Sequence, residues 1–375
     1  MNEVKFSKGL EGIPAAETVL TYIDGQEGKL YYLGIPIEEW AEKSTYEEVA
    51  LSLLLRRLPT KGELMLFDSA LRNSRDLPEE VIDFIYDLPP ETHPMAALRT
   101  VVSLLESYDE DAKGGDLESK FRISIKLIAK FPTIVAYFDR IRKGLEIVRP
   151  NPSLNHAANF LYMLRGEKPS EYETRVMDIA LILHADHEMN ASTFTSMVIA
   201  STLSDMYSAI TGGVGALKGP LHGGANEEVL KMFEEIGSED NVQNYIENAL
   251  SQKKKIMGFG HRVYKAYDPR AKILKRIAES LSMNSKYYKI AVKVEEYMMQ
   301  KVAQKGIFPN VDFYSGIVYN ALGISSDLFT PIFAISRVAG WCAHILEYLE
   351  DNRIFRPSVV YKGELDKPYI PIDQR

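Results

Sequence analysis

The sequence predicts a nearly all-α protein with one small β-hairpin near its N-terminus. Apolar residues recur at helical spacing from about residue 44 almost to the C-terminus. β-Branched and aromatic residues gather around a turn only once, and proline and glycine pairs cut the first half into segments of ordinary helix length. With 375 residues, the chain is long enough for two or more domains, or for one large core with a smaller lobe.

The composition excludes several classes of protein. A net charge of -8 argues against nucleic acid or an anionic membrane as the main partner, although local basic clusters can still bind a small anion. The single cysteine, Cys342, allows no disulfide and no thiolate metal cluster within one chain, which indicates a reducing compartment. Met1–Lys5 lacks an apolar core of a signal peptide, and charges interrupt the first long hydrophobic segment. We therefore expect a soluble, cytoplasmic protein.

Local signals predict the N-terminal elements. Residues 19–32 place β-branched and aromatic residues on both sides of Asp24-Gly25, which predicts the hairpin. Ser44-Thr45-Tyr46-Glu47 resembles a capping box and opens a helix that runs to Leu55. Later helices are separated by Leu58-Pro59, Leu88-Pro89-Pro90, Gly114-Gly115, Phe131-Pro132, Arg149-Pro150-Asn151-Pro152 and Gly166-Glu167-Lys168-Pro169.

The middle of the chain predicts two long helices. Residues 171–190 form the first, with His187 on its apolar stripe. Residues 191–217 carry one charge, Asp205, among many small side chains, which predicts a helix buried on all sides that ends at the glycines of 212–215.

The second half predicts a further set of helices. The set begins at Asn226, a good N-cap, and continues to about Leu322, with helices over 240–252, 268–282 and 286–305.

A long last helix is predicted over 331–349. Its near-heptad apolar stripe suits a helix–helix or subunit seam and consists of Ile335, Val338, Cys342, Ile345 and Leu349. The tail, residues 353–375, is too apolar to be simply disordered, and we expect it to pack as an extended arm.

His222 lies in a glycine-rich turn just before a predicted helix start. The partial positive charge of a helix N-terminus disfavours an imidazolium, so the ring is predicted to be neutral and able to donate a hydrogen bond to a developing oxyanion. The alternative is an ordinary turn histidine that bonds the backbone.

A second histidine, His261, ends the loop Gly258-Phe259-Gly260 and follows the lysines of 253–255. Lysines beside exposed backbone amides suit phosphate binding, whereas a lysine run at a helix end is also commonly just solvated. The chain has neither a P-loop motif nor a dinucleotide-binding glycine motif after a strand.

Other charged residues stand in unusual places. Asp268-Pro269 begins a helix and leaves Arg270 in its first turn, where the helix dipole disfavours a cation. Either a bound carboxylate or a nearby acidic side chain can offset this unfavourable interaction. Asp312 follows the N-cap Asn310, an ordinary place for an acid. Arg337 and Arg356 have mostly uncharged neighbours. Together with the two histidines, these groups suit enolisation of a thioester and condensation onto a polycarboxylate, which needs a base, a donor to the enolate and clamps for anions.

With these motifs in view, the chain resembles the citrate synthase family over most of its length. The resemblance rests on Gly219-Pro220-Leu221-His222-Gly223-Gly224-Ala225-Asn226, Gly258-Phe259-Gly260-His261 with Asp268-Pro269-Arg270, Pro309-Asn310-Val311-Asp312, and His184-Ala185-Asp186-His187-Glu188. It implies a citrate-synthase-like, two-domain helical homodimer: a large domain over 1–218 and 327–375, and a small mobile domain over 219–326, with the active site between them.

The resemblance also implies a role for each site residue. Asp312 takes a methyl proton from acetyl-CoA, His222 hydrogen-bonds the thioester oxygen, and His261 polarises the oxaloacetate carbonyl. The carboxylates of oxaloacetate bind His187, Arg270, Arg337 and, from the partner subunit, Arg356. The CoA segment is Lys255, Ile256, Met257, Gly258, Phe259 and Gly260. Citryl-CoA is then hydrolysed to citrate and CoA, with no metal and no cofactor besides these substrates.

Three alternatives remain at this point. A 2-methylcitrate synthase, or an enzyme that accepts both acetyl- and propionyl-CoA, shares these motifs, since one methylene changes binding by only about 1 to 3 kcal/mol. A catalytically silent, CoA-binding helical scaffold is a second alternative, against which the intact His222, His261 and Asp312 argue. A metal hydrolase built on His184 and His187 is the third, although no H-E-x-x-H motif and no defined third ligand appear.

Overall fold

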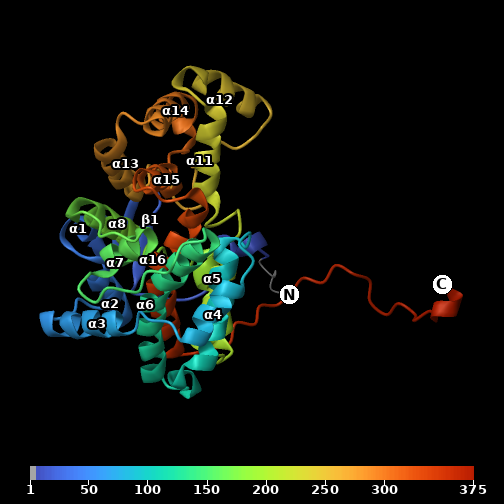
Figure 1. The fold of residues 1–375 in the computed structure, drawn as a ribbon. Helices are drawn as coiled ribbons and strands as arrows, with labels where there is room; N and C mark the ends of the chain where they lie inside the picture. The colour runs from blue at the N-terminus through green and yellow to red at the C-terminus, as the bar shows by residue number, and fades with distance from the viewer. Residues whose placement is uncertain (1–5) are drawn as a thin grey trace.

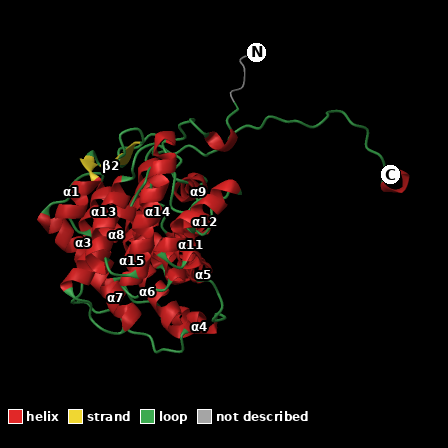
Figure 2. Ribbon diagram, turned by 90° about the horizontal axis from the view of Figure 1, so that it is seen from above, coloured by secondary structure: helices red, strands yellow, loops and turns green. Residues whose placement is uncertain are grey.

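The structure is a computed structural model that describes residues 6–375. It confirms the predicted all-α class, because strands occupy only one small sheet (Figures 1 and 2). The helices, in chain order, are α1 (Ile37–Lys43), α2 (Tyr46–Leu55), α3 (Lys61–Asn73), α4 (Glu79–Asp87), α5 (Pro94–Leu105), α6 (Leu117–Arg142), α7 (His156–Arg165), α8 (Glu171–His184), α9 (Ala191–Ser201), α10 (Met206–Leu217), α11 (Ala225–Ile236), α12 (Val242–Ser251), α13 (Pro269–Ser282), α14 (Lys286–Val302), α15 (Val311–Ala321) and α16 (Phe329–Leu349).

The predicted hairpin is present and carries one strand more than expected. Strands β1 (Thr21–Asp24) and β2 (Lys29–Tyr32) are antiparallel, and β3 (Ile35–Pro36) extends the sheet in the order β1-β2-β3. The Asp24 carboxylate accepts the backbone N–H groups of Gln26 and Glu27, at 3.1 and 2.9 Å, and so closes the turn. Sequence reasoning missed β3 because two residues carry no alternation pattern.

Helix α16 is the centre of the larger group of helices. Every residue from Phe329 to Leu346 is buried, and α2, α5, α6, α8, α9 and α10 surround it. The predicted stripe along this helix therefore packs within the chain, and the opposite face is buried as well. Ser326–Leu349 is the one segment of residues 6–375 long and apolar enough to cross a membrane, and its apolar window is wholly buried in this core.

Helices α11 to α15 form a second, smaller group, which lies at the top of Figure 1. Helix α15 packs against α11 and α13, and α14 packs against α11 and α12. Helix α13 follows the predicted start, because Asp268 caps it and Pro269 takes its first position. The smaller group lies within the predicted small domain, residues 219–326, and the domain boundaries themselves stay a prediction.

The prediction that Phe131-Pro132 separates two helices is wrong. Helix α6 runs through Pro132 without a break. Proline removes one backbone donor and costs about 3 kcal/mol in a helix interior. Here Pro132 and its neighbours Phe131, Thr133 and Ile134 are all buried against other helices, and this burial outweighs the local penalty.

The predicted helix over 171–190 ends early, at His184, so His187 lies in the following loop and not on a helical stripe. The helix ends here because the acidic side chains that follow it bind residues far away in the sequence. Asp186 pairs with His344 of α16, and Glu188, whose φ is 51°, accepts a hydrogen bond from the N-terminal sheet.

The single helix predicted over 191–217 is in fact two helices, α9 and α10. The one charge, Asp205, is the N-cap of α10 and accepts the N–H of Ser208 at 2.7 Å. The glycines of 212–215 lie inside α10 and do not end it. A Cβ on Gly213 comes within 2.4 Å of the Ser196 hydroxyl oxygen, so these glycines allow α9 and α10 to pack closely.

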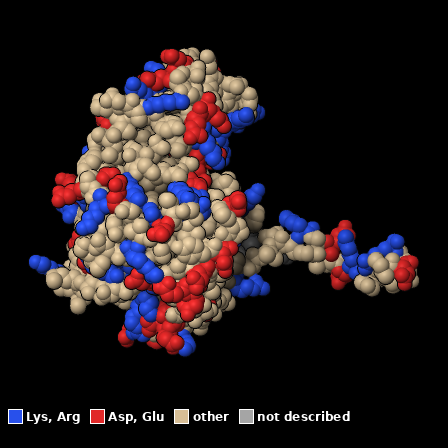
Figure 3. Space-filling model, in the orientation of Figure 1, with Lys and Arg blue, Asp and Glu red and all other residues tan. Residues whose placement is uncertain are grey.

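The tail leaves the body of the protein as an extended, exposed segment (Figures 1 and 2). It is extended, as predicted. Only its start packs on the body, where the ring of Phe355 contacts those of Phe194 and Tyr348, and residues 356–375 are exposed. Figure 3 shows basic and acidic side chains interspersed over the body and along the tail, without one dominant basic face in this view.

Candidate active site

Two histidine rings and a tyrosine meet where the two groups of helices face each other. His187 follows α8, and His261 and Tyr264 lie in the loop before α13. The His187 and His261 ring centroids are 5.3 Å apart, and each ring packs against that of Tyr264, at 5.6 and 4.7 Å. The Tyr264 hydroxyl lies 3.2 Å from Nε2 of His187. The structure thus brings together residues 74 positions apart in sequence, as the resemblance implies.

Arg337 of α16 is a buried cation that uses only some of its hydrogen-bond donors. Its Nε donates to the backbone oxygen of His184 at 2.7 Å, and its side chain lies over the ring of Phe333, with 4.7 Å from the guanidinium carbon to the centroid. Its two terminal nitrogens are buried, and no partner for them is found among residues 6–375. Burial lowers the pKa of Arg337 to about 10, so it stays charged at neutral pH. Two free, charged N–H groups in a buried place suit a carboxylate.

Arg270, in contrast, has a partner. It lies in the first turn of α13, and Asp268 binds it through both carboxylate oxygens, at 3.0 and 2.8 Å. Both side chains are buried. The acidic neighbour that sequence reasoning left open is therefore present, and it holds the guanidinium rigidly beside Tyr264, whose ring centroid is 5.9 Å away.

His222 is neutral, as predicted. Burial, with a contribution from Arg337, lowers its pKa to about 4. Nε2 lies 3.3 Å from the backbone nitrogen of Ser192, which can only donate. Nε2 is therefore the acceptor, and the proton is on Nδ1, which is free to donate to a ligand. Burial rather than the helix dipole is the main cause of the neutral state. The predicted N-cap Asn226 is wrong, because Gly224 is the N-cap and Asn226 lies buried in the first turn of α11.

His261 is neutral with the opposite tautomer. Its Nδ1 accepts the backbone N–H groups of Val263 and Tyr264, at 3.0 and 3.2 Å. The proton is consequently on Nε2. Burial, and then the positive charge of Arg270, lower the pKa of His261 to about 4. Each of the two histidines thus presents one N–H donor at neutral pH.

Asp312 is a carboxyl group with a strongly raised pKa. It lies in the first turn of α15, and Asn310 caps that helix as predicted, accepting the Asp312 N–H at 3.0 Å. Burial raises the pKa of Asp312 to about 7, although the positive charges of Arg270 and Arg337 lower it. A carboxylate that titrates near neutral pH is suited to act as a general base.

The predicted CoA segment, residues 255–260, is tied to the helix that carries Asp312. Gly258 accepts the N–H of Asn310 at 2.9 Å, and the Asn310 side chain donates to Gly260, also at 2.9 Å. Gly258 has a φ of 77°, and a Cβ there comes within 2.7 Å of the ring of Phe313. Glycine is therefore required for this close approach. Lys255 is exposed at the start of the segment, Ile256 is buried, and Met257 and Phe259 are half-buried.

Arg356 is not brought to this site within one chain. It lies exposed in the tail, where it donates to the backbone oxygen of Pro357 at 3.1 Å. His184 does not form a metal site with His187: its Nδ1 bonds the Ala180 carbonyl at 2.8 Å, and its ring packs on Phe333. No group of three or more possible metal ligands was found within residues 6–375, which leaves the metal alternative without a ligand set.

Sequence reasoning missed several residues that shape the site. Ser192 fixes the tautomer of His222, Tyr264 packs between two of the site's rings, and Phe333 lies under Arg337. Only Tyr264 had a signal, since it follows His261 by three residues. The others meet the site through contacts between distant parts of the chain.

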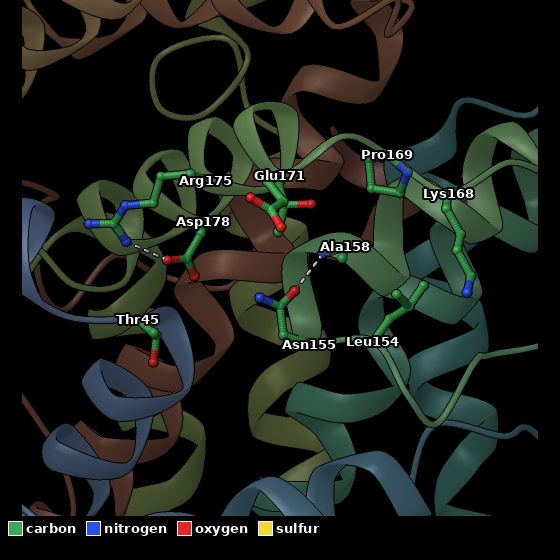
Figure 4. A pocket seen from close by; sticks show the side chains of 10 residues that line it. Thr45, Leu154, Asn155, Ala158, Lys168, Pro169, Glu171, Arg175 and Asp178 are labelled. Atoms are coloured by element: carbon green, nitrogen blue, oxygen red, sulfur yellow. Dashed lines mark hydrogen bonds and ion pairs between the residues drawn. The ribbon is translucent and has the colours of Figure 1, made fainter.

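A cavity of about 390 Å³ lies elsewhere, between the N-terminal ends of α2, α7 and α8 (Figure 4). Arg175 and Asp178 form an ion pair in its wall, and Asn155 caps α7 there. None of the predicted site residues lines it.

Comparison with known proteins gives a consistent result. A family model described as "Citrate synthase, C-terminal domain" matches residues 9–358. A protein of Deinococcus radiodurans named citrate synthase is 51% identical over 98% of this chain and 99% of its own length, and citrate synthase 2 of Bacillus subtilis is 48% identical over 98% and 99%.

Two solved structures have the same fold. A citrate synthase from Thermotoga maritima is similar with a TM-score of 0.91 and 47% identity, covering 99% of each chain. A ternary complex of carboxymethyl coenzyme A and oxaloacetate with citrate synthase from Thermoplasma acidophilum has a TM-score of 0.94 and 39% identity, covering 99% of this chain and 100% of that one.

Proposed function

The chain belongs to the citrate synthase family and is therefore an acyltransferase, and we propose that it condenses acetyl-CoA with oxaloacetate and water to citrate and CoA. The observation that carries the proposal is Arg337, whose two buried terminal nitrogens have no hydrogen-bond partner among residues 6–375. Its positive charge acts on the neutral His222 and on Asp312, whose pKa is raised, and the neutral His261 lies against His187. A dicarboxylate substrate supplies the missing partner.

In this proposal, oxaloacetate binds first to the cationic side of the site. The terminal N–H groups of Arg337 donate hydrogen bonds to one carboxylate of oxaloacetate, and Arg270 and His187 bind the other carboxylate. Asp268 holds Arg270 in position. His261 then donates Nε2–H to the keto oxygen, which polarises the carbonyl carbon for attack.

Asp312 and His222 activate the second substrate. The Asp312 carboxylate removes a proton from the methyl group of acetyl-CoA, while Nδ1–H of His222 hydrogen-bonds the thioester oxygen. A thioester's α-proton is weakly acidic, so removal by one carboxylate requires this concerted donor, and loss of such a donor typically costs about 10² to 10³ in rate. The enolate carbon attacks the polarised carbonyl carbon, and the thioester carbonyl re-forms. The new alkoxide takes the Nε2 proton of His261, and the proton that Asp312 removed returns to His261 through solvent, which restores both groups. Water then cleaves the thioester to citrate and CoA.

We propose that the enzyme works as a homodimer in the cytoplasm, with a small domain over 219–326 that closes over the substrates. Arg356 is exposed in the tail and donates only to the neighbouring Pro357 among residues 6–375, and in this proposal it completes the carboxylate clamps of a second copy. The tail exposes Val359, Tyr361, Leu365 and Tyr369, apolar surface that a partner subunit can cover.

The test is the release of CoA thiol from acetyl-CoA with and without oxaloacetate, repeated with propionyl-CoA and with a strong chelator. We expect oxaloacetate-dependent release that survives the chelator. Release with propionyl-CoA at equal efficiency establishes the dual-substrate alternative, loss with chelator restores the metal alternative, and CoA binding without release establishes the silent scaffold.

A further inference from the structure

The β1–β2 hairpin is bound at one end to the loop that carries His187. The Ile23 N–H donates to the Glu188 carboxylate at 3.0 Å. The Thr21 hydroxyl donates to the buried carboxylate of Asp186. Both neighbours of His187 in sequence are therefore held by β1.

The turn at the other end of the hairpin touches the loop that carries His261. The Gly25 carbonyl accepts the Lys265 N–H at 2.7 Å. A Cβ on Gly25 lies only 2.3 Å from the backbone oxygen of Val263, and one on Gly28 lies 2.7 Å from that of Tyr267. Neither glycine has room for a side chain, because the neighbouring atoms are backbone.

The contacted backbone is the part of the loop that orients His261. Nδ1 of His261 accepts hydrogen bonds from the N–H groups of Val263 and Tyr264. Gly25 lies against the backbone of Val263 and accepts the N–H of Lys265, so it contacts the same stretch of backbone. A displacement of this backbone consequently turns or shifts the His261 ring.

We propose that the turn of the β1–β2 hairpin is the docking surface that sets His261 at its working distance from His187, with Gly25 as a positioning residue. The inference rests on the proposed function, since it assigns both histidines to oxaloacetate. One hairpin contacts both histidine loops, which come from the two groups of helices, and therefore sets the distance between the rings, 5.3 Å in this arrangement of the two groups. Reacting groups need this precision, because a misplacement of about 1 Å can cost roughly a hundredfold in rate.

Gly25 offers a clean test because its own backbone accepts alanine. Its φ is not in the left-handed region, unlike that of Gly28, at 65°. In Gly25→Ala, the three atoms nearest to the added methyl group all belong to Val263 of the His261 loop. Gly115→Ala is the matched control, since Gly115 is also a loop glycine without positive φ and has nothing within 4 Å of its added Cβ.

The two variants are compared with the wild type by kinetics with each substrate and by melting temperature. For Gly25→Ala we expect kcat/KM for oxaloacetate to fall roughly tenfold to a hundredfold. The KM for acetyl-CoA stays within about twofold. The Tm without ligand falls below that of the control, because the Val263 backbone must move to admit the methyl group, so kinetics are measured at a temperature where the variant is fully folded. An unchanged kcat/KM for oxaloacetate, or a loss that merely tracks the unfolded fraction, overturns the inference.

If Gly25→Ala melts far below the control, Thr21→Val decides, because it deletes the hydroxyl at the other end of the hairpin while keeping size and β-propensity. We expect a raised KM for oxaloacetate there, and an unchanged KM refutes the positioning role. The proposed function is judged separately: a wild type without oxaloacetate-dependent release of CoA overturns it, whereas an active wild type with a fully active Gly25→Ala overturns only the hairpin's role.

Discussion

Condensation should weaken on the acid side of neutrality, because Asp312 must be ionised to accept a proton. With its pKa raised to about 7, roughly nine tenths of Asp312 is ionised at pH 8 and roughly one tenth at pH 6. We therefore expect kcat/KM for acetyl-CoA to fall about ninefold to tenfold over that interval. His222 and His261, whose pKa values are about 4, stay neutral throughout and add no further limb.

The assay is initial-rate release of CoA thiol at saturating oxaloacetate and constant ionic strength, from about pH 5.5 to 9. The melting temperature at each pH is the control, since it separates loss of catalysis from unfolding. A single limb with unit slope is expected, at about pH 7 or somewhat above it, because bound oxaloacetate favours the protonated form of Asp312. A rate that stays flat down to about pH 5 shows that Asp312 has an ordinary carboxyl pKa, and a slope of two assigns a second group; either result refutes this account.

The same group predicts how stability changes with pH. The folded-state pKa of Asp312 lies above its ordinary value of 3.8, so the folded state binds this proton more tightly than the unfolded chain. Ionisation accordingly costs stability as pH rises from about 4 to about 7. The shift corresponds to at most about 4 kcal/mol.

Asp312→Asn removes that cost along with the base. We expect the variant to melt above the wild type at pH 8, to bind oxaloacetate nearly as well, and to have no measurable condensation. Loss of oxaloacetate binding assigns Asp312 to the clamps instead, and a lower Tm than the wild type at pH 8 contradicts the stability argument.

Three further changes test other parts of the site. Arg337→Met should raise the KM for oxaloacetate about 10²-fold, since a charged hydrogen bond contributes about 1.5 to 3 kcal/mol. It should also raise the Tm, because a buried charge without an ionic partner is removed. An unchanged KM rejects the role of Arg337 in binding the carboxylate. Mixing inactive Arg356→Ala and His222→Ala subunits should restore partial activity by subunit exchange, and no recovery counts against a shared site. Asp186→Asn should lower Tm by breaking the buried pair with His344. The ion pair stabilises the fold at pH values above the ordinary pKa of Asp186, and its contribution is lost as the pH rises through the raised pKa of His344. The Tm difference between wild type and Asp186→Asn should therefore narrow at alkaline pH. A difference that does not change with pH argues against the ion pair.

Local signals predicted the starts of α13 and α15, but not the start of α10, whose cap Asp205 was assigned to the interior of one longer helix. Asp268-Pro269 starts α13 and Asn310 starts α15 as expected, because a capping side chain acts within three residues. The same reasoning failed at Pro132, where burial of the whole helix outweighs the missing backbone donor. It also failed at His184, where α8 stops because the residues beyond it bond distant elements.

The types of the candidate site residues could be predicted, whereas the tautomers of the histidines and the raised pKa of Asp312 could not. The pattern of motifs indicated two histidine donors and a carboxylate, and the neutral form of His222 was expected for a different reason. The tautomers depend on which backbone N–H faces each ring, Ser192 for His222 and Val263 for His261, and those contacts exist only in the folded chain. The raised pKa of Asp312 likewise comes from burial, which no first-turn position indicates.

The two arginines show how the site combines rigidity with affinity for an anion. Asp268 neutralises Arg270 and fixes its direction, so this cation is already in place before a ligand arrives. Arg337 has no such partner, and its nearest acidic influences are the Asp186 already paired with His344 and the titrating Asp312. A bound dicarboxylate therefore removes an electrostatic cost from the folded protein, and it also favours the protonated form of Asp312. Substrate binding and the ionisation of the base are thus coupled through Arg337, which is why oxaloacetate should bind Asp312→Asn at least as tightly as the ionised wild type.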